Sequence, residues 1–228
     1  KLLPGPYFMA TFTLPGDLRA LAKRHPKLID GFFKDSAQAL REILTDPKRC
    51  GFNKNGFLGV YQSWSQDLRY HPHIHFIVPA VGLDADGQVK KLKKSNYLVH
   101  AQVVADRLRT LLCQRIEDKG WMPRCSLWKL RKTSWIADIK FAGNGQNCLK
   151  YLGQYVGRSV IGDSRIVAIE GEFVSIRIKD RDTGKSHCIK IKGVEFIRRY
   201  LLHVLPSGFH RVRYRGFLHA RGKPTLQL

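Results

Sequence analysis

Three histidines stand at alternate positions in the stretch HPHIHFIVP, at His71, His73 and His75. In an extended strand, side chains two positions apart lie on the same face. The three imidazoles would therefore share one face, while Ile74 and Phe76 point to the other face and into a core. Neutral imidazole is a common metal ligand. We expect His73 and His75 to bind one ion, and His71, where the strand begins, to support the site without coordinating.

A third ligand has to come from a neighbouring element. Gln66 ends the preceding β-rich run in the motif WSQ, and it is well placed if the two runs pair. An amide oxygen suits Mg²⁺ or Mn²⁺ better than zinc. Two imidazoles and one amide leave positions open for water or a phosphate oxygen, as a catalytic ion requires. A His-x-His pattern also occurs in purely structural settings, and that interpretation stays open at this point.

Two tyrosines, Tyr151 and Tyr155, stand four residues apart in CLKYLGQYVGR. On a helix this spacing places both phenols on one face, which is ordinarily a core stripe. Here the neighbours include Lys150, Gln154 and Arg158, and Gly153 and Gly157 interrupt the segment, which is poor design for a core. A phenol with a pKa of about 10 is a weak nucleophile at neutral pH, unless a metal polarises its target phosphate and positive charge stabilises the phenolate. A metal on the histidine strand would supply that activation.

The charge of the chain indicates the substrate class. Its 228 residues include 40 Lys and Arg against 18 Asp and Glu, a formal net charge of +22 that attracts nucleic-acid phosphates. Five cysteines without a CxxC pair suggest neither a zinc knuckle nor a disulfide framework, which fits a reducing cytoplasm. No apolar run approaches the roughly 20 residues of a membrane span. The chain begins at Lys1 without an initiator Met, so we expect that preceding sequence has been removed.

Hydrophobic periodicity predicts the elements that position these residues. Helices are expected at residues 30–46, 98–119, 147–160 and 195–205, and strands at 6–15, 56–66, 73–81, 165–180 and 186–193. Residues 126–143 read as irregular structure followed by a strand, and DADG at 84–87 as a turn. Because only a few residues separate the runs at 56–66 and 73–81, we expect them to pair as antiparallel neighbours, with the histidine strand internal.

The predicted fold class is α+β, with a mostly antiparallel sheet flanked by helices and followed by a C-terminal β-meander and helix. We expect residues 1–162 to form the catalytic domain, and residues 163–228 to add the meander, helix and basic tail, packed on the same domain and contacting DNA. The tail SGFHRVRYRGFLHARGK interleaves arginines with aromatic residues, which suits phosphate contacts and base stacking, although it also fits a basic surface strand. The candidate DNA contacts are Lys150, Arg158, Arg165, Arg211, Arg213 and Arg215.

The motifs WSQ, HPHIHFIVPAVGLDADG, YLGQYVGRSVI and EFIRRYLLHVLPSGFHRVRYRGFL, in this order, resemble the two-tyrosine transposases of rolling-circle insertion sequences. These belong to the HUH endonuclease class, named for histidine, hydrophobic, histidine, which residues 73–75 satisfy. The resemblance extends from about the first strand to the arginine-rich end. It implies a palm of antiparallel strands flanked by helices, with the histidines on a central strand and the tyrosines on a helix that faces them.

The resemblance also implies an activity: metal-dependent cleavage of single-stranded DNA at transposon ends, which leaves a 5′-phosphotyrosine link and a free 3′-hydroxyl that can attack a target strand. By position, His73 and His75 match the metal histidines, with Mg²⁺ or Mn²⁺ as the cofactor, and Tyr151 and Tyr155 match the nucleophiles. Gln66 lies seven residues before His73, where related replication initiators often carry an acidic or polar third ligand. Members usually carry a cysteine-rich zinc segment before this domain, and its absence here supports trimming.

Two other functions remain open on the residues alone. A non-catalytic module that binds single-stranded nucleic acid would use the same sheet and basic tail, with structural histidines. A zinc hydrolase ranks lower, because no downstream His/Asp set of convincing spacing follows. The triplet GKS at 184–186 lacks the first glycine of a Walker A loop, so ATP-driven unwinding would require a separate host helicase. The sequence indicates no oligomeric state.

Overall fold

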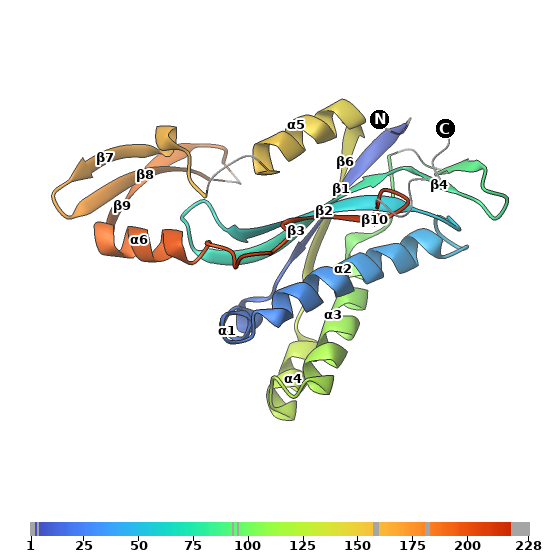
Figure 1. The fold of residues 1–228 in the computed structure, drawn as a ribbon, viewed down its shortest axis with the longest axis horizontal. Helices are drawn as coiled ribbons and strands as arrows, with labels where there is room; N and C mark the ends of the chain where they lie inside the picture. The colour runs from blue at the N-terminus through green and yellow to red at the C-terminus, as the bar shows by residue number, and fades with distance from the viewer. Residues whose placement is uncertain are drawn as a thin grey trace.

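A five-stranded antiparallel sheet forms the centre of the molecule, in the order β10-β2-β3-β1-β6 (Figure 1). The computed structural model describes residues 3, 5–92, 94, 96–156, 160–180 and 183–219. The strands of the sheet are β1 (Pro6–Thr13), β2 (Gly56–Trp64), β3 (Tyr70–Pro79), β6 (Ile136–Asn144) and β10 (Val212–Gly216). The predicted α+β class with an antiparallel sheet flanked by helices is confirmed.

The histidine strand β3 is the middle strand of this sheet, and it pairs with β2 on one side and β1 on the other. The prediction of an internal strand with β2 as its antiparallel neighbour is therefore confirmed. Along β3 the side chains alternate as expected. Ile74 and Phe76 are fully buried on one face, whereas His71 and His75 are only half-buried on the other.

The apolar face of the sheet packs against helices α2 (Lys27–Thr45) and α3 (Ala101–Asp118), which cross below it in Figure 1. Phe76 lies at the centre of this core, with its ring edge-on to those of Phe12, Phe33 and Phe57 at centroid distances of 5.5 to 5.7 Å. Gly59 of β2 lets the rings close onto the sheet, because a Cβ there would come within 2.6 Å of both Phe33 and Phe76.

Two short helices were not predicted from the sequence. Helix α1 (Gly16–Arg24) follows Pro15, which was interpreted only as the end of the first strand, and it buries Leu18 and Leu21. Helix α4 (Arg124–Lys132) occupies part of a segment predicted to be irregular, and that prediction is wrong. In α4 only Leu127 and Leu130 are buried. Two apolar residues in a basic segment are too few to give a clear helical periodicity.

The C-terminal part contains the predicted β-meander and helix. Strands β7 (Ile166–Glu170), β8 (Phe173–Lys179) and β9 (Ser186–Lys192) form a three-stranded sheet after the 3₁₀ turn η1 (Asp163–Arg165), and α6 (Gly193–Leu201) follows. A second small core lies here, formed by Leu68, Ile161, Val174, Ile176 and Ile191. Leu68 belongs to the turn between β2 and β3, so this turn connects the two sheets.

The turn is held in a conformation that leucine rarely adopts. Leu68 has φ of 62°, and its side chain is fully buried in the small core. The imidazole of His203, just after α6, donates from Nε2 to the carbonyl of Leu68 at 2.9 Å, and its Nδ1 lies 3.0 Å from the hydroxyl of Ser63. Burial and these contacts offset the backbone strain and fix the meander beside the end of β2.

The basic tail returns to the main sheet as its edge strand β10, beside β2. Part of the segment after residue 163 therefore belongs to the central sheet. The division into a catalytic domain at 1–162 and an added segment at 163–228 stays a prediction. The predicted turn at 84–87 joins the short strands β4 (Val81–Leu83) and β5 (Val89–Lys91). None of the helices in the described ranges is long and apolar enough to cross a membrane.

Candidate metal centre and nucleic-acid interface

The register of the sheet places polar side chains of three strands on one face. Thr11 of β1 lies opposite His75, and Gln62 of β2 lies opposite His73. Cross-strand neighbours of this kind share a face. Gln62 and His73 are both buried, with 4% and 5% of their surface exposed, while His75 is half-buried. The result is a row of donor atoms on the face that the helices α2 and α3 do not cover.

The hydrogen bonds of His73 define its orientation. Its Nδ1 lies 2.7 Å from the backbone carbonyl of His71, and a carbonyl can only accept, so Nδ1 donates. In the neutral imidazole, Nε2 then carries the lone pair, the form in which a metal-binding histidine is usually held. This Nε2 lies 2.9 Å from Oε1 of Gln62. Two acceptor atoms therefore face each other when the imidazole is neutral and the amide has this orientation. Protonation of His73, rotation of the amide, or a cation bound by both atoms would remove this conflict.

A divalent cation fits this set of donor atoms. The rings of His73 and His75 lie 4.8 Å apart between centroids, and Nδ1 of His75 lies 2.9 Å from the hydroxyl of Thr11. Imidazole nitrogens and an amide oxygen suit Mn²⁺ or Mg²⁺ and leave coordination positions open. Within the described residues, no group of three or more His, Cys, Asp or Glu side chains is placed to hold an ion. The set that the geometry offers is thus two histidines with one amide.

The predicted third ligand, Gln66, lies near this centre but has another partner. Its Oε1 accepts a hydrogen bond from the backbone N–H of Lys179 at 2.6 Å, and its carbonyl accepts from the guanidinium of Arg165. Gln66 therefore joins the turn after β2 to the meander. His71, the first histidine, lies 2.8 Å from the guanidinium of Arg19 through its Nδ1.

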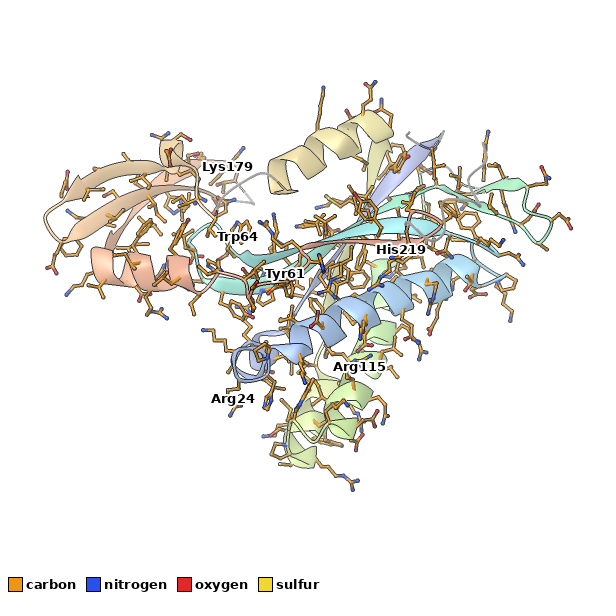
Figure 2. The ribbon with its side chains drawn as sticks, viewed as in Figure 1. Arg24, Tyr61, Trp64, Arg115, Lys179 and His219 are labelled. Carbon is orange, nitrogen blue, oxygen red and sulfur yellow. The ribbon has the colours of Figure 1, made fainter. Side chains whose placement is uncertain are left out.

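A cavity of about 620 Å³ opens between the histidine face and the meander. Thr11, Gln62, His73 and His75 line it from the main sheet, together with Gln66. Basic residues line it from the meander side: Arg165, Arg177 and Lys179. Trp64 at the end of β2 and Lys179 at the end of β8 both line this space (Figure 2). A polyanion that enters the cavity would meet cations opposite the histidines.

The tyrosine segment forms helix α5 (Gly145–Val156), as predicted. Its Cys148 is buried against Tyr7 and Ile77, which lie on the histidine face of β1 and β3. Helix α5 thus packs on the side of the sheet opposite α2, as Figure 1 shows. The side chains of Tyr151 and Tyr155 lie outside the described part of the structure.

The residues predicted to contact DNA are distributed over several surfaces. Lys150 is exposed on α5, and Arg158 lies outside the described residues. Arg165 lines the cavity, but its Nε donates to the carbonyl of Arg177, and burial lowers the pKa of its guanidinium. These three residues, where described, belong to the side of the sheet that carries the histidines.

The arginines of the tail are divided between the surroundings of Trp64 and the opposite face of the sheet. Arg211 stacks over the ring of Trp64 at 5.2 Å from its centroid. Arg213 pairs with Asp30 at 2.5 Å and lies 4.6 Å from the centroid of Phe33, on the helix-covered face. Arg215 stands two residues after Arg213 on β10 and therefore shares its face. The structure therefore does not bring the three arginines to the histidines as one group.

Comparison with known proteins identifies the family of the chain. Residues 56–224 match the family model Y2_Tnp, described as "Putative transposase". The chain belongs to this transposase family. The match includes the histidine strand, the tyrosine helix and the tail, in agreement with the resemblance seen in the sequence motifs.

Two curated relatives support the assignment to the transposase family. The chain is 37% identical over 97% of its length to "Putative transposase y4qJ" of Sinorhizobium fredii, and 26% identical over 95% of its length to "Transposase for insertion sequence element IS801" of Pseudomonas savastanoi pv. phaseolicola. It spans only 60% and 55% of the length of these two proteins. A comparison with solved structures found no significant match.

Sequence reasoning missed several residues of the site. Gln62 lies eleven positions before His73, and only the register of the β2–β3 pair, which shifts at a bulge between Gln62 and Trp64, brings the two together. Arg177 and Lys179 were interpreted as part of an alternating strand. The alternation RIK indicated that the two basic residues share a face of the strand. It did not indicate that this face lines the cavity of the histidines.

Proposed function

We propose that this transposase chain cuts single-stranded DNA at transposon ends and joins it to a target strand, with Tyr151 and Tyr155 as nucleophiles and a divalent ion held by His73 and His75. The observation that carries the proposal is the central position of the His-x-His strand, with the tyrosine helix packed on the same face of the sheet. Membership in the transposase family supports a DNA substrate. The protein would act at the bacterial nucleoid.

We further propose Gln62 as the third ligand, because its Oε1 already lies 2.9 Å from Nε2 of His73. The sequence-based choice, Gln66, is the alternative. Mg²⁺ or Mn²⁺ bound by these residues would polarise a phosphate oxygen and stabilise charge that develops in the reaction. The backbone carbonyl of His71 holds the proton of His73 at Nδ1, and the hydroxyl of Thr11 fixes the orientation of the His75 ring through its Nδ1.

The reaction follows from the nucleophile. The phenol of one tyrosine loses its proton and its oxygen attacks the phosphorus of a phosphodiester. A bond from phosphorus to the tyrosine oxygen forms while the bond to the 3′ oxygen breaks, and that oxygen takes up a proton to leave as a 3′-hydroxyl. Because the phosphotyrosine keeps the diester bond, a 3′-hydroxyl of another strand can reverse the step without nucleotide hydrolysis. Arg177 and Lys179, across the cavity from the histidines, would attract the DNA backbone.

The test is formation of a covalent adduct. The chain is incubated with Mg²⁺ or Mn²⁺ and a 3′-labelled single strand from an authentic transposon end, and the products are separated on a denaturing gel. The label moves with the protein, because the 5′ phosphate of the cleaved fragment is attached to tyrosine. We expect the double variant Tyr151→Phe, Tyr155→Phe to form no adduct, and EDTA to abolish the adduct of the unaltered chain.

The matched control is Tyr97→Phe, which removes a phenol that is 53% exposed and outside the cavity. This variant should form the adduct as well as the unaltered chain. An adduct that persists in the double variant would show that the nucleophile is another residue. No adduct from the unaltered chain with an authentic end would favour a module that only binds single-stranded nucleic acid.

A further inference from the structure

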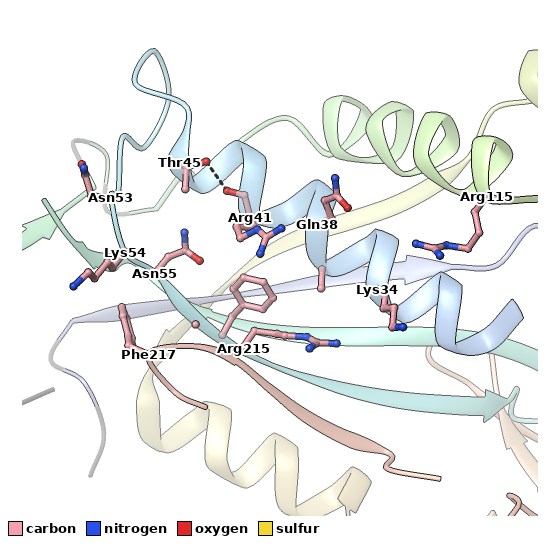
Figure 3. Close-up of a pocket in the computed structure, with 13 residues that line it drawn as sticks. Lys34, Gln38, Arg41, Thr45, Asn53, Lys54, Asn55, Arg115, Arg215 and Phe217 are labelled. Carbon is pink, nitrogen blue, oxygen red and sulfur yellow. Dashed lines mark hydrogen bonds between the residues drawn. The ribbon is translucent and has the colours of Figure 1, made fainter. Parts of the chain in front are cut away.

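A second cavity, of about 640 Å³, lies on the other face of the central sheet. Helix α2 forms one side with Lys34, Gln38 and Arg41, and β10 forms the other with Arg215 (Figure 3). Phe57 contributes to its lining from β2, on the face that also carries Phe76 and is opposite to the histidines. The cavity therefore does not communicate with the metal centre through the sheet, and the function proposed above does not use it.

The lining of this cavity is strongly basic. It includes five cationic side chains, those of Lys34, Arg41, Lys54, Arg115 and Arg215, and no carboxylate. Arg115 is neutralised by two hydrogen bonds to Asp35, at 2.6 and 2.7 Å. Among the residues that the structure describes, no ion pair to a carboxylate is made by the other four side chains. A net positive charge thus remains in a space the size of a small-ligand pocket.

Arg215 distinguishes this cavity from an ordinary solvated basic surface. Its guanidinium is half-buried, and its Nε is buried without a hydrogen-bond partner. Burial, with the charges of Arg213 and Arg41, lowers the pKa of Arg215. A buried donor without an acceptor and two like charges nearby both cost free energy. An anion bound in the cavity would offset the repulsion between Arg215 and its two cationic neighbours.

The backbone around Arg215 is held firmly. At Gly216, φ is +57°, and a Cβ would come within 1.7 Å of the carbonyl oxygen of Asn55. The next residue, Phe217, donates its backbone N–H to that same carbonyl at 3.2 Å. The end of β10 is therefore closed tightly onto the start of β2. The side chains of Asn53 and Asn55 also line the cavity and can donate hydrogen bonds to phosphate oxygens.

We propose that this cavity binds a phosphodiester of a second DNA segment, on the face of the sheet opposite to the cleavage site. The four unneutralised cations select a polyanion, and Arg215 contributes a half-buried guanidinium at the firmly held end of β10. The occupant is taken to be DNA because the function proposed above makes DNA the substrate. A strand that occupies both cavities would pass round the sheet edge at β10. The second cavity would then hold DNA that flanks the cleaved bond and add to affinity without taking part in the chemistry.

The test compares two single strands with the same variant. The variant Lys34→Ala, Arg41→Ala, Lys54→Ala removes three exposed cations and leaves the half-buried Arg215 in place. One probe is a labelled transposon-end strand of about ten nucleotides around the cleaved bond, which is close to the length covered by a single binding domain. The other probe is the same end with about thirty flanking nucleotides, well beyond that length. Binding of the long strand is measured at several salt concentrations, and adduct formation is measured on the short one.

The long strand should bind the variant at least about tenfold more weakly. The slope of log K against log salt should fall by about 2, because each lost phosphate contact on a single strand contributes about 0.7. Adduct formation on the short strand should be unchanged. The control variant Lys27→Ala, Lys119→Ala, Lys129→Ala removes the same charge from exposed positions outside both cavities, and it should reduce the salt slope by less.

Equal losses of affinity for the long strand in the two triple variants would overturn the proposal, since they would show only a general effect of charge. A loss of adduct formation on the short strand as large as the loss of affinity for the long strand would also overturn it, because the cavity would then be part of the cleavage site. Suppose that neither the unaltered chain nor the variants form an adduct, but the first triple variant alone loses affinity for the long strand. The phosphodiester site then stands and the proposed cleavage function fails.

Discussion

The two faces of strand β3 differ completely although the same ten residues build both. On one face, His73 and His75 meet Gln62 and Thr11 in an open cavity. On the other face, Phe76 and its neighbours form a closed core under α2 and α3. The period of two in a strand makes this separation, so one face can carry reactive groups while the other supplies most of the stability.

The comparison also shows why the donor atoms can be fixed so closely. The carbonyl and hydroxyl partners of His73 and His75 lie on β3 itself and on β1, within a sheet whose opposite face is tightly packed. A rigid strand holds ligands more precisely than a loop does. The packed face therefore keeps β3, and with it the histidines, in place. Substitutions on the packed face should mainly change stability, and substitutions on the open face should mainly change metal binding.

The largest effect is expected on the packed face. Phe76→Ala should lower the free energy of unfolding by about 3 to 5 kcal/mol, because it leaves a cavity among three edge-on rings. The control His75→Ala, on the open face of the same strand, loses the hydrogen bond to Thr11 and leaves no cavity in the core, so it should cost about 0.5 to 1.5 kcal/mol. Urea unfolding of both variants measures the difference. Similar losses would mean that the open face carries as much of the stability.

The next effect concerns the open face and decides between the two glutamines. Gln62→Ala removes the proposed third ligand and should weaken Mn²⁺ binding by at least about tenfold, since loss of even a group that only orients a ligand commonly costs that much. Gln66→Ala should leave Mn²⁺ affinity nearly unchanged and cost about 0.5 to 1.5 kcal/mol of stability, because its oxygen bonds the meander. Calorimetric titration with Mn²⁺ measures both affinities. The reverse ranking would make Gln66 the ligand.

The smallest effect is a pH dependence of the junction between β2 and the meander. Burial lowers the pKa of His203, so below the ordinary histidine pKa of about 6.5 the unfolded chain binds a proton that the folded chain resists. The free energy of unfolding should therefore fall as the pH drops through that value. In His203→Gln the fall between pH 7.5 and 5.5 should be smaller, as measured by urea unfolding at each pH. An unchanged pH dependence would exclude His203 as its source.

Alternation and helical periodicity were sufficient to predict the central histidine strand, its pairing with β2 and the helices α2, α3 and α5, because each is a local pattern. The short helix α4 was missed because its local pattern is weak. Gln62 was missed, because only the pairing register of β2 and β3 places it opposite His73. Arg213 pairs with Asp30 across 183 residues, a contact that only the folded sheet creates.

The most direct test of the central claim is whether the histidine face binds a divalent ion. Pulsed electron paramagnetic resonance of the Mn²⁺-loaded chain detects couplings to coordinated imidazole nitrogen. We predict these couplings in the unaltered chain and in His71→Ala, and their loss in the double variant His73→Ala, His75→Ala. Absence of the couplings in the unaltered chain, or their persistence in the double variant, would contradict the account.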